Sequence, residues 1–409
     1  MDLLLKRRRI IASQRGEDTT DYTLLPLTFK CLTGGNLSIK NANGSYDRNF
    51  EYSLNGGAWT AFDLPKNTAS KLIATLSPND TISFRRDNDN FADTQFISDS
   101  NLTFDIYGNL LSLQYGSAFN GQTELRNTSK TAFGATFSGT NVVDASKLML
   151  TSSIVSNGCY KSMFENCVLL QFLPKLFTSS TAESCYENMF KNTGITTIPD
   201  GFFDTITGAA HKFCASMFKN CNYLVTVPNN LLSKIQLSTS CYEGMFNGCI
   251  SLRNAPSLPA TNLTTNCYLF MFYGCESLVV APELPATILQ NRCYESMFEG
   301  CTNLVNAPEL PATTLAQSCY KNMFKDCTSL TTAPELLATT LVAQCYYSMF
   351  ANCNNLNYLR CLATDISANN CTTDMLNPVA QQGTFVKASG VNWPSGRYGI
   401  PNGWTVIEE

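Results

Sequence analysis

The chain has 409 residues, of which 44% are apolar and 15% are charged, and its formal net charge at pH 7 is −4. This length predicts two or three domains with a large buried interior. The nearly balanced charge provides no overall basic field, which argues against nucleic acid as a partner. No stretch of about 18 apolar residues occurs, so we expect no membrane span.

Residues 1–20 form a polar arm with a basic cluster at Lys6, Arg7, Arg8 and Arg9. The leucines of the arm precede this cluster, whereas a secretory signal places its positive residues first and a longer apolar run after them. We therefore expect the protein to stay in the cytosol where it is made. Three interpretations of the arm remain open: a disordered terminus, a segment that orders against another protein, or a contact with nucleic acid.

Residues 21–99 contain short runs of β-forming residues, such as NFEYSL and KLIATL, separated by the turn-forming stretches GG, NANG, NGG and SPND. This pattern predicts a small antiparallel β-sandwich of about six strands, which would act as a mount or spacer. In the transitional residues 100–158, VVDASKLML at 142–150 resembles the extended part of the later repeats. We therefore expect a degenerate capping repeat there.

From residue 159 the chain repeats itself. The spacings between the opening cysteines are 26, 29 and 27 residues and then five times 26, with the units starting at Cys159, Cys185, Cys214, Cys241, Cys267, Cys293, Cys319 and Cys345 and a truncated ninth at Cys371. A unit of this size cannot bury its apolar face alone, so neighbouring units must stack and share one core.

Each unit carries the frame C-Y-x-x-M-F-x-x-C-x-x-L, in which the cysteines, Met and Leu fall on one stripe of an α-helix. The following LVNAPELPATTL contains prolines that exclude a long strand. We therefore predict an α/β solenoid with a helix and a short strand in each unit: eight repeats over 159–370, closed by a C-terminal cap at 371–409. In the cap, GTFVK and WTVIEE are expected to pair as strands.

Seventeen of the eighteen cysteines lie at or beyond Cys159. On a helix, eight residues rise roughly 12 Å, whereas bridged Cα atoms lie within about 7 Å, so Cys293 and Cys301 cannot pair. Metal sites favour closer cysteine pairs with histidine, and His211 is the sole histidine. We favour buried, reduced thiols that act as small apolar groups, with a disulfide or a metal as the open alternatives.

The frame M-F-x-x-C-x-x-L, followed by a short strand and proline, resembles the leucine-rich repeats of BspA-like bacterial surface proteins, in the form found in gut anaerobes and their phages. The resemblance covers about 159–370, and the end of the chain is similar to that subgroup's C-terminal cap. It implies a right-handed solenoid used for adhesion or protein binding. Bacterial members are typically exported, so the expected absence of a leader favours a phage virion protein.

The resemblance thus implies a non-enzymatic virion protein, a fibre or a decoration on head or tail, without cofactors. Lys6, Arg7, Arg8 and Arg9 are its candidate attachment residues to other virion proteins, and the solenoid would bind a host-surface protein or glycan. Such appendages are often trimeric. A bacterial cell-surface or secreted adhesin and a virion-borne polysaccharide-degrading enzyme remain the alternatives.

The extended segments carry the candidate ligand-facing residues. Glu283, Glu309 and Glu335 occupy one position in successive repeats, and parallel strands would place them about 5 Å apart. Their side chains either spread into water or form a weak acidic stripe for a basic partner or a cation. Variable positions beside them supply further candidates: Val280, Asn306, Thr332 and Tyr358. Catalysis has little support, because no nucleophile elbow, P-loop or dinucleotide fingerprint occurs.

Overall fold

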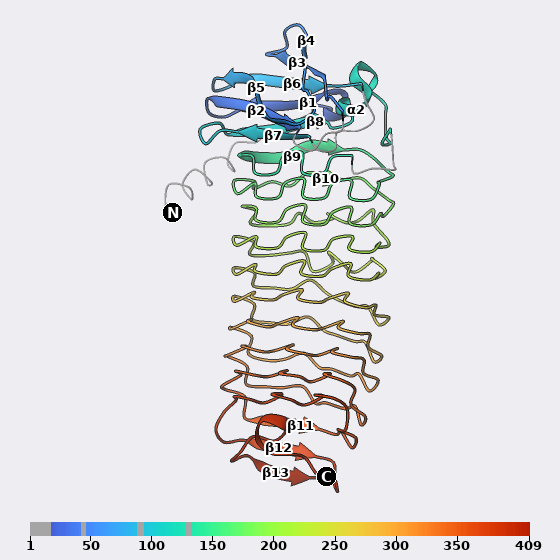
Figure 1. The fold of residues 1–409 in the computed structure, drawn as a ribbon, viewed down its shortest axis with the longest axis vertical. Coiled ribbons are helices and arrows are strands. Elements are labelled where there is room, and N and C mark those ends of the chain that lie inside the picture. Colours follow the sequence, from blue (N-terminus) through green and yellow to red (C-terminus); the bar gives the residue numbers. More distant parts are fainter. Residues whose placement is uncertain (1–17, 42–45, 88–93, 127–131) are drawn as a thin grey trace.

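Two β-sheets at the N-terminal end continue into a long stack of coils in the computed structural model (Figure 1). The structure describes residues 18–41, 46–87, 94–126 and 132–409. The candidate attachment residues Lys6, Arg7, Arg8 and Arg9 lie outside the described residues.

The larger N-terminal sheet has the strand order β10-β9-β8-β1-β6-β3-β4, and the smaller has the order β5-β2-β7. The first seven strands are β1 (Leu27–Cys31), β2 (Gly35–Asn41), β3 (Phe50–Leu54), β4 (Thr60–Phe62), β5 (Thr68–Leu76), β6 (Thr81–Arg85) and β7 (Thr94–Ser98). Their alternating apolar residues meet in one aromatic cluster, where the ring of Phe29 lies 4.9 Å from that of Phe96 and 4.8 Å from that of Phe104.

The larger sheet leads directly into the solenoid. Strand β8 (Phe104–Asn109) pairs antiparallel with β1 and parallel with β9 (Val142–Leu150), which in turn pairs parallel with β10 (Lys175–Leu176). The sheet therefore runs across the boundary expected at residue 99, and its last strands already have the parallel register of stacked repeats. The short elements η1 (Tyr22–Leu24), α2 (Ser112–Tyr115) and η2 (Gly116–Ala118) lie beside it.

The prediction of an α/β solenoid with a helix in each repeat is wrong. In the described residues the only α-helix is the four-residue α2. The segment C-Y-x-x-M-F-x-x-C instead forms consecutive four-residue turns: the amide of Met297 donates to the carbonyl of Tyr294 at 3.2 Å, and that of Cys301 donates to Phe298 at 3.0 Å. The third residue of each turn is left-handed, with φ of 53° at Ser296 and 75° at Gly300. These are the features of type II β-turns.

The physical reason lies in the residues between the apolar ones. Left-handed φ recurs every four residues, and the positions that adopt it are mostly Ser, Asn and Gly, such as Ser318, Asn322 and Gly274. Gly and Asn tolerate that conformation, and all three residue types are poor in helix interiors. Apolar residues spaced four positions apart are compatible both with a helix and with a run of four-residue turns. The Ser, Asn and Gly residues between them favour the turns.

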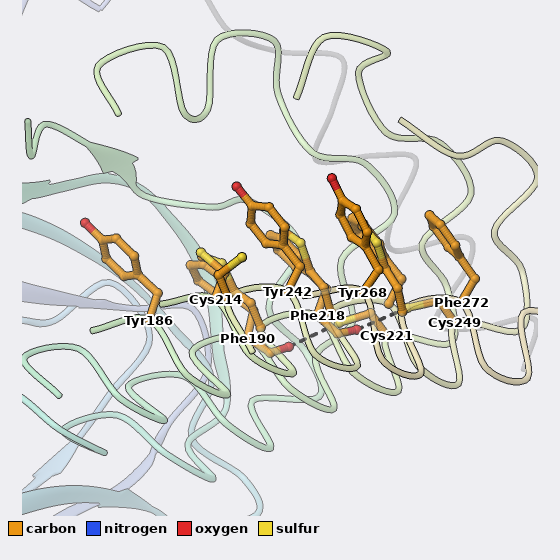
Figure 2. Close-up of a cluster of buried hydrophobic side chains, with 14 of the residues drawn as sticks. Tyr186, Phe190, Cys214, Phe218, Cys221, Tyr242, Cys249, Tyr268 and Phe272 are labelled. Carbon is orange, nitrogen blue, oxygen red and sulfur yellow. Dashed lines mark hydrogen bonds between the residues drawn. The ribbon is translucent and has the colours of Figure 1, made fainter. Parts of the chain in front are cut away.

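The turns leave every second amide free to bond the next coil. Ser296 donates to Lys321 at 2.8 Å, and Phe298 donates to Met323 at 2.9 Å. In a helix these amides would donate to carbonyls of the same segment, whereas here they bond the next coil and hold successive repeats in register. The repeated side chains consequently stack in columns, as the rows of Tyr and Phe rings in Figure 2 show.

The phenylalanine column is the most regular feature of the core. Neighbouring rings lie 5.3–5.8 Å apart with interplanar angles of 4–19°, through Phe137, Phe164, Phe190, Phe218, Phe246, Phe272, Phe298, Phe324 and Phe350. At its N-terminal end Phe137 stacks on Phe96 of β7 at 5.8 Å. One continuous apolar core therefore joins the sheets to the solenoid.

All eighteen cysteines are buried free thiols. The second cysteine of a repeat has a defined bonding role, because its Sγ donates to the phenylalanine carbonyl of the preceding coil (Figure 2). These contacts measure 3.0–3.2 Å at Cys167, Cys221, Cys249, Cys275, Cys301, Cys327 and Cys353. The sulfurs thus join successive coils without being linked to one another.

The irregular spacings near Cys214 come from a shifted register. Tyr186 donates its amide to Phe213, and Cys214 donates to Cys241, so Phe213 occupies the first-cysteine position and Cys214 the tyrosine position. The spacings between equivalent residues there are therefore 28 and 28 rather than 29 and 27. Upstream, Phe133 stacks on Tyr160 at 6.3 Å, which places 132–150 as one further coil.

The C-terminal end forms a parallel sheet of β11 (Tyr358–Cys361), β12 (Thr384–Lys387) and β13 (Thr405–Glu408). Its turn-rich connection contains η3 (Gly396–Tyr398). Beneath it, Trp404 is buried and donates its indole N–H to the carbonyl of Ala380 at 2.8 Å. This sheet closes the described end of the core.

Candidate functional site

The extended side of the solenoid brings the variable candidate residues into one line. Parallel bridges join Val280 to Asn306 and Asn306 to Thr332, and all three side chains are exposed. Val280 is 68% exposed, an unusually open position for an apolar side chain. Tyr358, one repeat further on, begins β11 and is also exposed. These four residues form a surface that we call the variable stripe.

The glutamates lie beside the variable stripe. Glu283, Glu309 and Glu335 are exposed, and each precedes a buried leucine that anchors its segment to the core. Glu335 accepts a hydrogen bond from Arg360 at 2.7 Å, and Arg360 also pairs with Glu409. One of the three carboxylates is thereby neutralised, so the acidic character of this line is strongest at Glu283 and Glu309.

The turn side of the solenoid is occupied by its own ion pairs. Lys191 contacts Glu165 at 2.8 Å, and Lys325 contacts Glu299 at 2.9 Å, each linking neighbouring coils. The hydrogen bond that Lys325 donates to Glu299 raises the pKa of the lysine. These partly exposed pairs join neighbouring coils, and each contributes no more than about 1 kcal/mol.

The described titratable groups with the largest pKa shifts belong to the packing of the core. Burial raises the pKa of Cys159 and Cys319 to about 12, and burial raises the pKa of Tyr294 far above its ordinary value. Such thiols and phenols stay neutral at physiological pH and act as packing groups. His211 is exposed, with Nδ1 3.1 Å from the carbonyl oxygen of Thr239.

Within the described ranges, no group of three or more His, Cys, Asp or Glu side chains is placed to hold a metal ion. None of the helices in this part of the chain has the length and hydropathy that crossing a membrane requires.

A hollow of about 470 Å³ opens beside the loops that follow the turns, in the first coils of the array. Its lining consists of Val168, Asn192, Thr193, Asn220, Asn222, Tyr223, Gly248 and Ile250. Our sequence-based prediction missed this site. The available signal was the departure from 26-residue spacing, together with Thr193-Gly194-Ile195 where the other units read C-x-x-L.

Two more hollows, of about 480 and 300 Å³, lie on the N-terminal sheets. The ion pair of Arg85 with Glu51 lines the first, and Lys147, which lines the second, pairs with Asp18. The contacts to Lys147 and Tyr22 lower the pKa of Asp18. The first pair joins strands β3 and β6, and the second joins β9 to the segment that precedes η1.

No protein-family model and no curated protein matches the chain. A solved structure that is similar is a leucine-rich repeat protein from Bacteroides ovatus, with 20% identity and a TM-score of 0.33 over 54% of this chain and 52% of that one. The match thus spans about half of that protein. A likeness at this level supports neither membership of the BspA-like subgroup nor a phage origin.

Proposed function

We propose that this protein is a non-enzymatic adhesion protein of a phage particle, a fibre or a decoration on head or tail. The solenoid binds a receptor on the host surface, and the N-terminal end, with the arm at Lys6–Arg9, attaches to the particle. The phage assignment is supported by the resemblance of the repeat sequence to the BspA-like repeats found in gut anaerobes and their phages. Assembly as a homo-oligomer, a trimer for instance, belongs to the same proposal.

One observation supports binding above all others. Along the variable stripe the backbone is uniform, since parallel bridges hold each repeat to the next, while the exposed side chain changes from Val280 to Asn306 and Thr332. Two residues earlier in each unit the buried side chain is always leucine: Leu278, Leu304 and Leu330. The surface chemistry can therefore vary without disturbing the core, which suits recognition.

The hydrogen-bonded coils also make the surface rigid. Each described coil bonds its neighbour through several amides and stacks its aromatic rings on the next. A preformed surface loses little conformational entropy on binding, so more of the contact energy appears as affinity. At about 5 Å per coil, eight coils give a face on the order of 40 Å long.

The virion assignment is tested by mass spectrometry of purified particles, combined with labelling by an antibody against the solenoid. We expect the protein in the particles and the label on their exterior. Its absence from gradient-purified particles would remove the phage part of the proposal.

The adhesion assignment is tested by measuring binding of the purified full chain to intact host cells. We expect the double substitution Val280→Arg and Asn306→Arg to reduce binding if the variable stripe contacts the receptor. Asn303→Arg, at an exposed position outside the variable stripe, serves as the control for added positive surface charge. Equal binding by all variants would exclude the stripe, and no binding by the unmodified chain would contradict adhesion.

A further inference from the structure

The hollow near the start of the solenoid arises from one shortened loop. A regular unit has two residues between the second cysteine and the leucine, as in Cys301-Thr302-Asn303-Leu304, whereas Thr193-Gly194-Ile195 has only one. A Cβ on Gly194 would lie 2.3 Å from the carbonyl oxygen of Val168, so only glycine lets this loop approach the preceding coil so closely. The shortened loop leaves a depression between the longer loops on either side.

The side chains around the depression depart from those of the regular units. The position after the second cysteine carries polar residues in the later coils, namely Glu276, Thr302, Thr328 and Asn354. Around the hollow it carries Val168 and Ile250, which are 56% and 42% exposed, and in the coil before Ile250 it carries Asn222, followed by Tyr223, which is 46% exposed. Large apolar side chains gathered at one exposed spot on an otherwise polar edge indicate a contact surface.

The polar part of the lining consists of amides. Asn192, Asn220 and Asn222 contribute side chains that combine N–H donors with a carbonyl acceptor, and Asn192 already donates one N–H to Oδ1 of Asn166 at 2.6 Å. Gly248 leaves room for one of them, since a Cβ there would lie 2.3 Å from Oδ1 of Asn220. Thr193 forms the buried floor. No Asp, Glu, Lys, Arg or His side chain lines the hollow.

We propose that this hollow binds a neutral oligosaccharide. A sugar ring has hydroxyl groups that both donate and accept hydrogen bonds, which the amides of Asn192, Asn220 and Asn222 match. It also has an apolar C–H face, which suits an exposed ring such as that of Tyr223 with Val168 and Ile250 beside it. The volume falls within the range of small-molecule sites.

The neutral lining decides against charged ligands. An acidic glycan or a charged peptide would bring its charge to a site without a counter-charge and would lose hydration there. The inference rests on the proposed adhesive function and specifies its ligand as a glycan bound at this hollow, apart from the variable stripe. Binding of a protein receptor here is the competing outcome.

The test is binding of the full chain to an array of neutral hexose and N-acetylhexosamine oligosaccharides, with sulfated and uronic-acid oligosaccharides as charged probes. Isothermal titration with the strongest neutral probe then compares variants. We expect Tyr223→Ala and Asn222→Ala each to weaken binding by about tenfold, the scale of one lost stacking or hydrogen-bond contact. Both residues are exposed, so these substitutions leave the core intact.

Tyr398→Ala is the matched control, because it removes an exposed tyrosine, 56% against 46%, that lies outside both the hollow and the variable stripe. Binding to none of the neutral probes, preference for the charged probes, or equal loss in Tyr398→Ala and Tyr223→Ala overturns the inference. A chain that binds host cells through a protein receptor and is unaffected by Tyr223→Ala leaves the adhesive function intact and refutes only the glycan site.

Discussion

Replacing Gly300 by alanine distinguishes the turn structure from a helix, because the substitution should lower the free energy of unfolding in the first case and raise it in the second. Gly300 has a φ of 75°, and a left-handed conformation costs an L-residue about 1–2 kcal/mol. An added Cβ would lie 3.5 Å from the Cα of Gly274, an ordinary contact, so the cost is conformational rather than steric. Alanine also lowers the conformational entropy of the unfolded chain, which offsets about 0.4–1 kcal/mol of this cost and leaves a net destabilisation of about 1 kcal/mol.

In a helix the same substitution would stabilise by about 0.5–1 kcal/mol. Hydrogen exchange of the amides in 293–304 measures the difference locally, and 1 kcal/mol corresponds to roughly fivefold faster exchange in the alanine variant. Gly300→Asn is the control, since Asn166 and Asn352 occupy the equivalent position with φ of 64° and 65°. It should exchange more slowly than Gly300→Ala. Slower exchange in Gly300→Ala than in the unmodified chain would refute the turn assignment.

Three further predictions follow from the core. Phe298→Ala, which removes a buried ring stacked 5.7 and 5.6 Å from its neighbours, should cost about 3–5 kcal/mol in denaturant unfolding, whereas Tyr358→Ala should stay within about 0.5 kcal/mol; equal effects would contradict the column. Burial raises the pKa of Cys159 and Cys319 to about 12, so between about pH 8.5 and pH 12 these thiols ionise only in the unfolded chain. The free energy of unfolding should therefore be unaffected below about pH 8.5 and fall above it by about 1.4 kcal/mol per thiol per pH unit. Thermal melts that show no such decline across this range would contradict the prediction. Deleting 319–344, one complete repeat, should preserve the circular dichroism spectrum and a monodisperse elution profile, whereas deleting 320–344 should not, since every column would lose register.

The buried positions of a repeat were readable from the sequence. Met297, Cys301 and Leu304 repeat at fixed positions, and all three are fully buried. The exposure of Glu309 and Val280 agrees with their expected outward orientation. Stacking of copies on one another also follows from the repeat itself, because an isolated unit would leave its apolar face in water.

The hollow beside Gly194 could not be located in the same way. Its lining comes from four different coils, represented by Val168, Thr193, Tyr223 and Ile250. The shortened loop at Thr193-Gly194-Ile195 is visible in the sequence, but the depression depends on how far the loops of the adjoining coils project. That distance is a property of the assembled stack.

The sequence by itself determined that this protein stacks near-identical units and changes its exposed residues from copy to copy, whereas the state of its thiols was decided by the structure. It determined this because period and polarity are local properties of the chain. Only the tertiary structure decided whether the repeated segment is a helix or a run of turns. Each amide can bond within its own segment or to the next coil, and the hydrogen bonds that the amides of Ser296 and Phe298 donate to the carbonyls of Lys321 and Met323 settle that competition in favour of the coils.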